Sequence, residues 1–557
     1  MAAPLAAQPS RTTPDFGPNV TIVGPATPAT TIQSTLDSIF ALQQSSEFGA
    51  GRYAVLFEPG HYDVDARVGF YTQVSGLGRS PDDVVINGGM RADARWRRGN
   101  ATLNFWRAVE NMAVVPAGGF DRWAVSQAAP MRRVHIQGDL VLDDGGWASG
   151  GFLADSKIDG QVRSGTQQQW LTRNSTIGSW TGSNWNMVFV GTERAPANSF
   201  PDPPYTTIDA APVIREKPFL FVDRGGTWKV LVPALRSGAK GTSWISGSLR
   251  GTTRALSEFL IVKPGTSVAA MNAALARGLS LIIAPGVYHL DTPLHVTRRN
   301  TVVLGLGLAT LIADGGVRAI AVDDVDGVSL AGLLIEAGPI NSEVLVQIGP
   351  AGSSARHSSN PTVLSDLFVR VGGAGVGKAT RSVEINSSDV IGDHLWLWRA
   401  DHGNGVGWTS NTASNGLVVN GRNVTMYGLF VEHYQQYQVL WNGDGGRTYL
   451  FQNEMPYDVP SQADWMSGAT RGFAAYRVDA AVTSHEAQGL GSYCFFNRNP
   501  TVVADHAFEV PITPNVRLRD MVIVSLGGGR GTIAHVVNET GAAARPGATV
   551  QTLVTGP

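Results

Sequence analysis

The chain contains one succession of elements twice, and this internal repeat restricts the possible folds more than any other feature. In each half a helix-like stretch precedes a short strand, a Pro-Gly-x-Tyr turn, a second strand and a Gly-Leu-Gly sequence. The matching segments are 31–40, 54–64 and 74–78 in the first half, and 268–275, 281–290 and 303–307 in the second. Three matches in the same order at similar spacing indicate two copies of one architecture.

Each half is predicted to be a right-handed parallel β-helix. Short apolar runs return about every 20 residues after each turn, a period typical of solenoids. The helix-like stretch would cap the first coil, because an uncovered coil end leaves backbone groups unpaired. We therefore expect an all-β fold of two tandem β-helices, at 1–215 and 263–557, joined by a long connector at 216–262. The alternative is an ordinary pair of β-sandwiches.

Composition agrees with this fold and argues against several partners. The 557 residues are enough for two domains, and the 66 glycines and 30 prolines follow no collagen period. Net charge is −2 and 16% of residues are charged, so we expect no nucleic-acid partner. We expect no membrane span, because no apolar run reaches about 18 residues. No metal motif is found, so no metal or other cofactor is expected, and the chain is expected to be a monomer.

The aromatic residues suggest a carbohydrate partner. The chain has 14 tryptophans; most are expected in the core, but aromatic faces also stack on sugar rings. The single cysteine, Cys494, lies among apolar residues and is predicted to be a buried thiol.

Segment 428–458 contains two glutamates, Glu432 and Glu454, each in a run of β-branched and aromatic residues. They are separated by roughly one coil, so equivalent positions on successive coils would stack them about 5 Å apart. Two carboxylates that close cannot both ionise at low cost. One pKa should rise, which keeps a proton available for general acid catalysis. The alternative is a hairpin with two solvated glutamates.

The residues described so far resemble glycoside hydrolase family 55, whose members are β-1,3-glucanases built from two side-by-side right-handed β-helices. The resemblance covers nearly the full chain and rests on the repeat, on the run at 396–403 (WLWRADHG) and on the two glutamate segments. The most specific motif is 452–458 (QNEMPYD), whereas the Pro-Gly-x-Tyr turn also occurs in many pectin-lyase-like solenoids. The resemblance implies inverting hydrolysis of laminarin-type glucan from the non-reducing end, with release of glucose.

The resemblance also implies catalytic roles for five residues. Glu454 would be the general acid, and Glu432 the nearby carboxylate that raises its pKa. Tyr457 would lie at the same site. The attacking water would be held by Gln127 and Ser149 from the first half, which places the site between the two β-helices. Carboxylates about 5 Å apart are typical of retaining enzymes, and inverting enzymes leave roughly 6.5–9.5 Å, so Glu432 would not be a simple base.

Five further residues are candidates for substrate binding. Asp401 and His402 follow the tryptophan run and could bind hydroxyls of the terminal glucose, or could instead form a buried pair that orders a turn. Trp408 and Trp441 could form a sugar platform or belong to the core. Arg447 could contact substrate or stabilise a turn.

Other functions remain open from sequence. A β-helical lyase would need a base to neutralise a uronate, and Arg447 is the only one near the glutamates. A glycan transferase, acting for example on fructan, would use similar chemistry. A non-catalytic carbohydrate-binding solenoid would not need the Glu454–Tyr457 motif. The start of the chain, MAAPLAAQPS, resembles a mature secreted protein with an added Met, so we expect a secreted protein whose signal peptide has been removed.

Overall fold

The computed structural model describes residues 13–245 and 249–556. The N-terminal decapeptide on which the secretion prediction rests lies outside these residues. Within the described ranges the protein is all-β, with α-helices at α1 (Ala29–Gln43) and α2 (Val268–Ala276), and no helix there is long and apolar enough to cross a membrane.

The first half forms one sheet of 15 strands, and its pairings are parallel. We call it the N-terminal stack. Its strands are β1 (Val20–Val23), β2 (Tyr53–Phe57), β3 (Gly60–Arg67), β4 (Thr72–Gly76), β5 (Val84–Arg91), β6 (Arg107–Pro116), β7 (Phe120–Arg122), β8 (Pro130–Ile136), β9 (Asp139–Val141), β10 (Phe152–Ala154), β11 (Lys157–Arg163), β12 (Gln169–Arg173), β13 (Thr176–Thr181), β14 (Asn186–Val190) and β15 (Tyr205–Ile208).

The middle of the chain is antiparallel. Strands β16 and β19 pair with each other, and β17, β18 and β20 form a three-stranded sheet. Their bounds are β16 (Ala211–Ile214), β17 (Phe219–Val222), β18 (Trp228–Pro233), β19 (Arg236–Ala239) and β20 (Gly251–Ala255). Strand pairing therefore changes from parallel to antiparallel after Ile208. It becomes parallel again at Phe259, where the second parallel sheet begins. The division into three domains stays a prediction.

The second half forms two sheets, of 12 and nine strands, that are parallel except for the last strand, β43. We call it the C-terminal stack. The larger sheet contains β21 (Phe259–Val262), β22 (Ser280–Ile283), β23 (Val287–Leu290), β25 (Val302–Ala313), β27 (Ser329–Ala337), β29 (Val363–Val371), β31 (Ile391–Arg399), β33 (Thr425–Glu432), β35 (Gly446–Glu454), β39 (His485–Cys494), β41 (Val516–Ser525) and β43 (Val550–Thr555).

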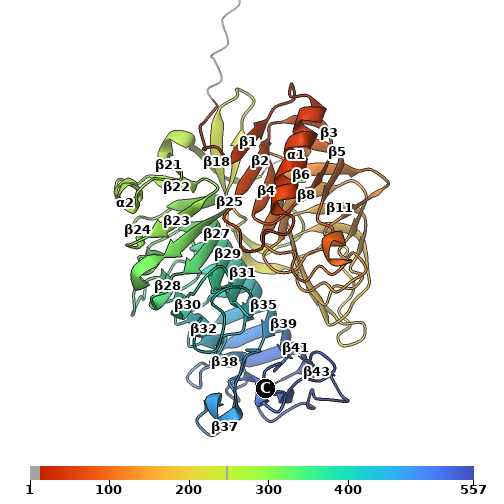
Figure 1. The fold of residues 1–557 in the computed structure, drawn as a ribbon, viewed down its shortest axis with the longest axis vertical. Helices are drawn as coiled ribbons and strands as arrows, with labels where there is room; N and C mark the ends of the chain where they lie inside the picture. The colour runs from red at the N-terminus through yellow and green to blue at the C-terminus, as the bar shows by residue number, and fades with distance from the viewer. Residues whose placement is uncertain (1–12, 246–248, 557) are drawn as a thin grey trace, which may run out of the picture.

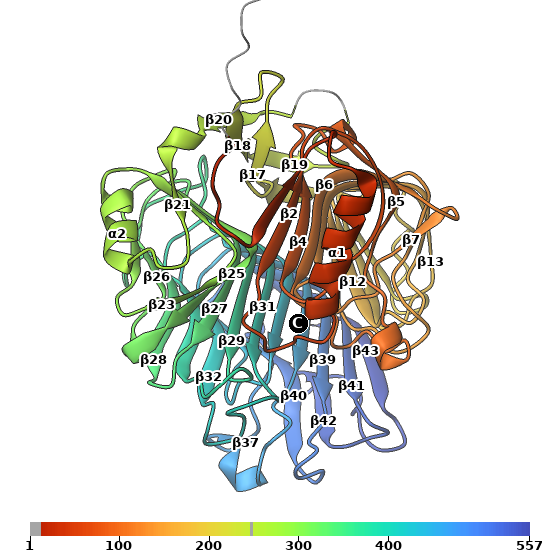
Figure 2. The same cartoon turned by 45° about the horizontal axis from the view of Figure 1, so that its top comes forward.

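The smaller sheet contains β24 (Leu294–Val296), β26 (Ile320–Val322), β28 (Ser342–Ile348), β30 (Ala379–Ile385), β32 (Ala413–Val419), β34 (Val439–Trp441), β38 (Tyr476–Val478), β40 (Val503–Glu509) and β42 (Thr532–Val537). Strands β36 (Met466–Ser467) and β37 (Thr470–Arg471) form a separate hairpin. The N-terminal stack, red to orange, lies beside the C-terminal stack, green to blue (Figure 1). Strands β2 and β4 lie directly against β25 (Figure 2).

The predicted repeat is confirmed in detail. Tyr62 and Tyr288 of the two Pro-Gly-x-Tyr turns donate to the carbonyl oxygen four residues earlier, over 2.7 Å and 2.8 Å. A Cβ atom on Gly60 or Gly286 would lie 2.7 Å or 2.9 Å from a proline ring, so both turns need glycine at this close approach. The parallel pairing excludes the alternative of two antiparallel β-sandwiches.

The three largest apolar cores of the described residues follow from the two-residue alternation of the strands. One core fills each stack, and a third lies between the stacks. In β31, for example, Leu395 and Leu397 point into the C-terminal stack, whereas Trp396 and Trp398 belong to the core between the stacks. The alternate residues of these strands, to which Trp396 and Trp398 belong, therefore face the N-terminal stack.

Eight of the twelve strands of the larger C-terminal sheet, those from β25 to β41, bend at a left-handed residue. These residues stand at equivalent register positions, and their φ angles run from 49° to 73°. They are Leu308, Gly332, Asp366, His394, Gly428, Leu450, Gly489 and Asp520. Glycine is preferred at a positive φ, and Gly428 also leaves room for Phe152 of the other stack, 3.1 Å from where its Cβ atom would be. The bend thus repeats on the successive coils from β25 to β41 and shapes the surface that meets the N-terminal stack.

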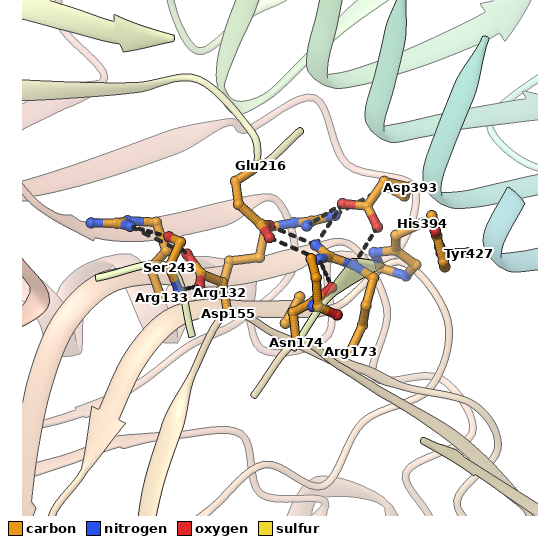
Figure 3. A network of polar contacts seen from close by, with 12 residues as sticks. Arg132, Arg133, Asp155, Arg173, Asn174, Glu216, Ser243, Asp393, His394 and Tyr427 are labelled. Atoms are coloured by element: carbon orange, nitrogen blue, oxygen red, sulfur yellow. Dashed lines mark hydrogen bonds and ion pairs between the residues drawn. The ribbon is translucent and has the colours of Figure 1, made fainter. Parts of the chain in front are cut away.

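A buried ionic network joins the two stacks (Figure 3). Arg132 of β8 forms ion pairs with Asp366 and Asp393 over 2.8 Å and 2.7 Å. Arg173 of β12 bonds Asp393 over 2.8 Å and Glu216 over 2.7 Å. These side chains are almost inaccessible to solvent. Burial alone would raise the pKa of Glu216, but the Arg173 guanidinium overcomes that and lowers it to about 2.

We predict that Arg173→Met strongly destabilises the fold. The substitution leaves two buried carboxylates without one of their cations, which typically costs roughly 3–5 kcal/mol. Urea unfolding followed by tryptophan fluorescence measures the change. Lys240→Met is the control, since it removes an exposed ion pair with Asp209 that is worth about 0–1 kcal/mol. Equal losses of unfolding free energy in the two variants would show that the buried network stabilises the fold no more than an exposed ion pair does.

Candidate active site

Glu432 and Glu454 are direct neighbours on adjacent parallel strands. They form a register pair at the ends of β33 and β35, so their backbones lie one strand spacing, about 4.8 Å, apart. The predicted stacking is confirmed, and the hairpin alternative is wrong because β34, which lies between them in sequence, belongs to the other sheet. Both side chains lie on the same face of the sheet as Phe430, which belongs to the core between the stacks.

Glu432 is buried and fully engaged. Gln127 Nε2 donates to Glu432 Oε1 over 2.8 Å, and Trp396 Nε1 donates to Oε2 over 2.8 Å. Only 3% of the residue is exposed. Gln127 comes from the N-terminal stack, so the two stacks meet at this carboxyl, and each of its oxygens already accepts one bond.

Glu454 is the more accessible of the two carboxyls. Its side chain is 19% exposed. The hydroxyl of Tyr457 donates to Glu454 Oε2, and His433 Nε2 lies 3.9 Å from the same oxygen. Tyr457 reaches back because the strand ends at Glu454 and the chain turns through Met455 and Pro456. The predicted association of Glu432, Glu454, Tyr457 and Gln127 is thus present.

Burial dominates the electrostatics of the carboxyl pair. It raises the pKa of Glu432 well above its usual range, and the neighbouring Glu454 charge raises it further. Burial also raises the pKa of Glu454, although His433 and the Tyr457 hydroxyl favour its charged form. The pKa of Tyr457 is raised well above its ordinary value by burial and by Glu454, so its hydroxyl keeps its proton. A proton-holding carboxyl at an accessible position can act as a general acid.

Gln127 and Ser149 precede the bends of successive coils in the N-terminal stack. Their next residues, Ala128 and Gly150, both have positive φ. A Cβ atom on Gly150 would lie 3.2 Å from Gln127 Cδ and from a Phe430 ring carbon, so glycine allows the close approach there.

Ser149 connects to the carboxyl pair through two further residues. Gln169 Nε2 donates to Ser149 Oγ over 3.0 Å, and Tyr493 donates to Gln169 Oε1 over 2.8 Å. Tyr493 is the register neighbour of Glu454 on β39. This chain of bonds runs from one stack to the other, so Ser149 lies close to the site but bonds neither glutamate.

Asp401 and His402 form a charged cluster on the other side of the glutamates. His402 contacts Asp401 Oδ1 over 2.8 Å and Glu47 Oε1 over 2.6 Å. Burial opposes the charges, but the two carboxylates raise the pKa of His402 to about 10. Likewise burial would raise the pKa of Asp401, but His433 and His402 lower it to about 2. His433 Nε2 lies 3.8 Å from Asp401, which links this cluster to Glu454.

An aromatic wall closes this side of the site. Phe48 stacks on Trp398 with centroids 6.3 Å apart, and Trp398 stacks on Trp396 at 5.1 Å. The backbone carbonyl of Glu47 accepts a bond from the Tyr71 hydroxyl. The loop that follows α1 is therefore anchored against the C-terminal stack at Glu47 and Phe48.

Two predicted binding residues lie elsewhere. Trp441 is fully buried in the core of the C-terminal stack and its indole nitrogen donates to Gly443 O, so the prediction of a sugar platform is wrong. Arg447 starts the strand that Glu454 ends, and it faces a surface hollow with Glu486 and Arg517. It is not part of the glutamate cluster. Trp408 is half-buried near Arg399, and its role stays a prediction.

Comparisons with known proteins identify the family of this chain. The family model described as the LAM55 pectate lyase-like domain matches residues 259–454. An exo-beta-1,3-glucanase of Streptomyces sp. (strain SirexAA-E / ActE) is 54% identical over 530 residues, which covers 95% of this chain and 87% of that protein. This chain belongs to glycoside hydrolase family 55.

Solved structures support the family assignment along the whole chain. The structure of sacteLam55A from Streptomyces sp. SirexAA-E has a TM-score of 0.96 and 52% identity, covering 98% of this chain and 99% of that one. A variant of sacteLam55A in complex with glucose matches with the same values.

Several site residues of this family 55 chain escaped the sequence analysis. They are Glu47, Phe48, Gln169, Trp396, His433 and Tyr493. Trp396 and His433 could have been found, because one lies two residues before Trp398 and the other directly follows Glu432. Glu47 and Gln169 carry no local signal, since their partners lie in the other stack. Within the described residues, no cluster of His, Cys, Asp and Glu is arranged to hold a metal ion.

We predict that Glu454→Gln stabilises the protein as pH rises. The folded state holds a proton on this carboxyl over a pH range in which the unfolded chain has lost it, so the wild type loses stability from about pH 4 upward. Glutamine does not titrate and still accepts a bond from Tyr457. The difference in free energy of unfolding should be smallest near pH 4 and grow in favour of the variant toward neutral pH.

Chemical denaturation at a series of pH values measures this difference. Glu343→Gln, at an exposed position, controls for the loss of a negative charge. A variant whose advantage is the same at every pH would show that Glu454 does not titrate differently in the folded and unfolded states.

Proposed function

We propose that this chain hydrolyses laminarin-type β-1,3-glucan from the non-reducing end with inversion, releasing glucose. The observation that carries the proposal is the buried carboxyl pair at the junction of the stacks, in which Glu454 is accessible and has a raised pKa. The substrate class is supported by the family 55 relative named an exo-beta-1,3-glucanase and by the glucose complex of sacteLam55A.

Glu454 acts as the general acid in this proposal. Its proton passes to the glycosidic oxygen as the bond to the leaving sugar breaks. Burial keeps the pKa of both carboxyls high, and Tyr457 holds the Glu454 carboxyl in place through its hydroxyl. A protonated acid and a second, buried carboxyl divide the roles as expected for coupled groups in unequal environments.

Gln127 and Ser149 hold the attacking water. Glu432 is a poor candidate for nucleophile or base because donors occupy both of its oxygens. This favours a water on the N-terminal side, and it removes the conflict between close carboxylates and inversion. Gln127 is fixed by its bond to Glu432, and Ser149 by the bond that its hydroxyl accepts from Gln169. The attacking water gives up its proton to solvent, and Glu454 regains from solvent the proton that it donated.

The closed side of the site favours removal of terminal units. Glu47, Phe48 and Trp398 obstruct the direction toward the first coils. Asp401 is held anionic and could accept bonds from hydroxyls of the terminal glucose. A chain end fits such a closed site, whereas the middle of a polymer would need an opening on both sides.

We further propose that both stacks are right-handed β-helices capped by α1 and α2. Parallel pairing at coil-length intervals supports this, as do the apolar faces of the helices, which belong to the cores of their stacks. We also propose a monomer that acts outside the cell, where a polymeric glucan is accessible.

The product profile tests the proposed function. Incubation with laminarin and with linear β-1,3-gluco-oligosaccharides should release glucose as the first product, because only the terminal unit reaches Glu454. Proton NMR at early times should show α-glucose before mutarotation if the reaction inverts. Longer oligosaccharides as first products would contradict the exo action, and no product would move the search to other glycans, fructan first.

Glu454→Gln should reduce hydrolysis by roughly 10²–10⁴-fold, the usual contribution of a general acid. The variant should stay folded and still bind oligosaccharide, as measured by calorimetry. Lost turnover with retained binding would also exclude a purely carbohydrate-binding solenoid. Unchanged turnover would overturn the assignment of the acid.

Gln127→Ala should lower kcat more than it raises KM. The side chain is placed to hold the water rather than the sugar, and loss of this positioning costs roughly 10²-fold. Initial rates over a range of laminaritriose concentrations separate the two constants. A change in KM alone would move Gln127 from catalysis to substrate binding.

A further inference from the structure

Arg399 and Asp458 form an ion pair with two hydrogen bonds close to the carboxyl pair. The guanidinium donates from Nη1 to Asp458 Oδ1 over 2.9 Å and from Nη2 to Oδ2 over 2.7 Å. Arg399 ends β31, in the sequence run 396–403, and Asp458 ends the run 452–458 that contains Glu454. We call this ion pair the Arg399 clamp. Neither of its two residues has a role in the proposed mechanism.

Arg399 is buried, and its hydrogen bonds occupy the whole guanidinium. Besides the two bonds to Asp458, Nε donates to the carbonyl oxygen of Asn411 over 2.8 Å. Nη1 donates to the carbonyl oxygen of His433 over 3.2 Å, and Nη2 to that of Gly407 over 3.1 Å. Only 1% of the residue is exposed. A guanidinium has five N–H donors in a rigid planar fork, so Arg399 fixes four separate points of the chain relative to one another.

The alternation of side chains along β31 places Arg399 on the opposite face of the sheet from the glutamates. Leu397 belongs to the core of the C-terminal stack, whereas Trp398 belongs to the core between the stacks. Arg399 therefore points into the end of the C-terminal stack, where it is buried. Glu432 faces the other way, as Trp398 does, because these two residues are register neighbours. The clamp thus supports the strand ends of the site from inside the stack.

The Arg399 clamp reaches Glu454 by two routes. Asp458 directly follows Tyr457, whose hydroxyl donates to Glu454 Oε2. His433 accepts a bond from Arg399 at its carbonyl oxygen, and its Nε2 lies 3.9 Å from the same Glu454 oxygen. The rings of His433 and Tyr457 also contact each other edge to face, with centroids 4.4 Å apart. One guanidinium therefore anchors both groups that adjoin the accessible carboxyl.

We propose that Arg399 is a positioning residue for the general acid. Its bonds to Asp458 hold Tyr457 in place, and its bond to the His433 carbonyl holds the imidazole ring. Both groups then keep the Glu454 carboxyl directed at the glycosidic oxygen. This inference rests on the proposed function and deepens it, because it names the support that orients the proton donor.

Loss of the clamp should change the pH dependence of activity. Burial raises the pKa of Glu454, and His433 and the Tyr457 hydroxyl act against this rise. If these two groups move away, the pKa of Glu454 rises further. The acid must carry its proton to act, so the fall of kcat/KM at alkaline pH should move to higher pH. The other titratable groups that face this carboxyl stay in place, and they are Asp401, His402, Glu432 and Tyr493.

Asp458→Asn tests the proposal with little change of shape. Asparagine keeps one oxygen for the guanidinium but turns an NH2 group toward its second donor, so one bond is lost. The bonds from Arg399 to the three carbonyl oxygens remain. The kcat for laminaritriose should fall roughly tenfold, less than the 10²-fold that a misplacement of about 1 Å can cost. KM should change little, and the alkaline fall of kcat/KM should move to higher pH.

Arg399→Lys is the second variant. An ammonium group has three donors and no planar fork, so kcat should fall further than in Asp458→Asn and the alkaline fall should move in the same direction. Circular dichroism and urea unfolding check that both variants are folded.

Asp505→Asn is the matched control. Asp505 of β40 also accepts bonds from an arginine, Arg471 of β37, over 2.7 Å and 2.8 Å. Its side chain is 24% exposed, as is that of Asp458, but it belongs to the smaller sheet of the C-terminal stack. The kcat and the pH profile of this variant should equal those of the wild type.

Two results would overturn the positioning role. One is a folded Asp458→Asn enzyme with the kcat and pH profile of the wild type. The other is a lower kcat with an unmoved alkaline fall, since this shows only a smaller fraction of active enzyme. A wild type that cleaves no β-1,3-glucan would instead overturn the proposed function, on which this inference rests.

Discussion

The buried ionic network between the stacks is the constraint on which the site depends. Neither stack holds the complete candidate site, because Gln127 comes from one and the glutamates that it meets come from the other. Apolar contacts alone tolerate sliding of one surface along another, whereas Arg132 and Arg173 meet Asp366 and Asp393 in one alignment only. Buried ion pairs often add little net stability and can contribute structural specificity instead. Here that specificity aligns the coil of Gln127 with the coil of Glu432.

Once the stacks are aligned, the alternation of side chains along each strand decides which residues face the other stack. Successive coils place Arg370, Trp398, Glu432, Glu454 and Tyr493 at one register position. Arg370 is neutralised by Glu336 over 2.7 Å. The two glutamates lie next to each other instead, and Glu454 has His433 at 3.9 Å in place of a bonded arginine. Among the residues at this register position, Arg370 is therefore paired with an opposite charge, whereas the Glu432–Glu454 pair favours a bound proton. That pair faces the N-terminal stack.

Much of the fold and part of the site could be predicted from the sequence. The Pro-Gly-x-Tyr turns and the coil-length spacing of Glu432 and Glu454 are local patterns, and a parallel stack converts such spacing directly into contact. Trp441 was misplaced because an aromatic residue in a short strand does not reveal which face it occupies. Arg447 was misplaced because nearness along a strand is not nearness in space. Glu47 and Gln169 could not be found, since only the packing of one stack on the other gives them partners.

The arrangement of charges also explains why Glu454, the proposed general acid, lies on a later coil than the Asp401–His402 cluster at the closed side of the site. Asp401 stays anionic because His402 and His433 surround it, and His402 stays cationic because Glu47 and Asp401 hold it. Glu454 lies one coil beyond Glu432, within 3.9 Å of His433, and the charges of Asp401 and His402 still act on its pKa. A sugar held at the charged cluster would therefore present its leaving side to the one carboxyl that keeps its proton and remains accessible. Reversing the two glutamates would bury the proton donor beneath Gln127 and Trp396, so the order of the coils itself selects Glu454.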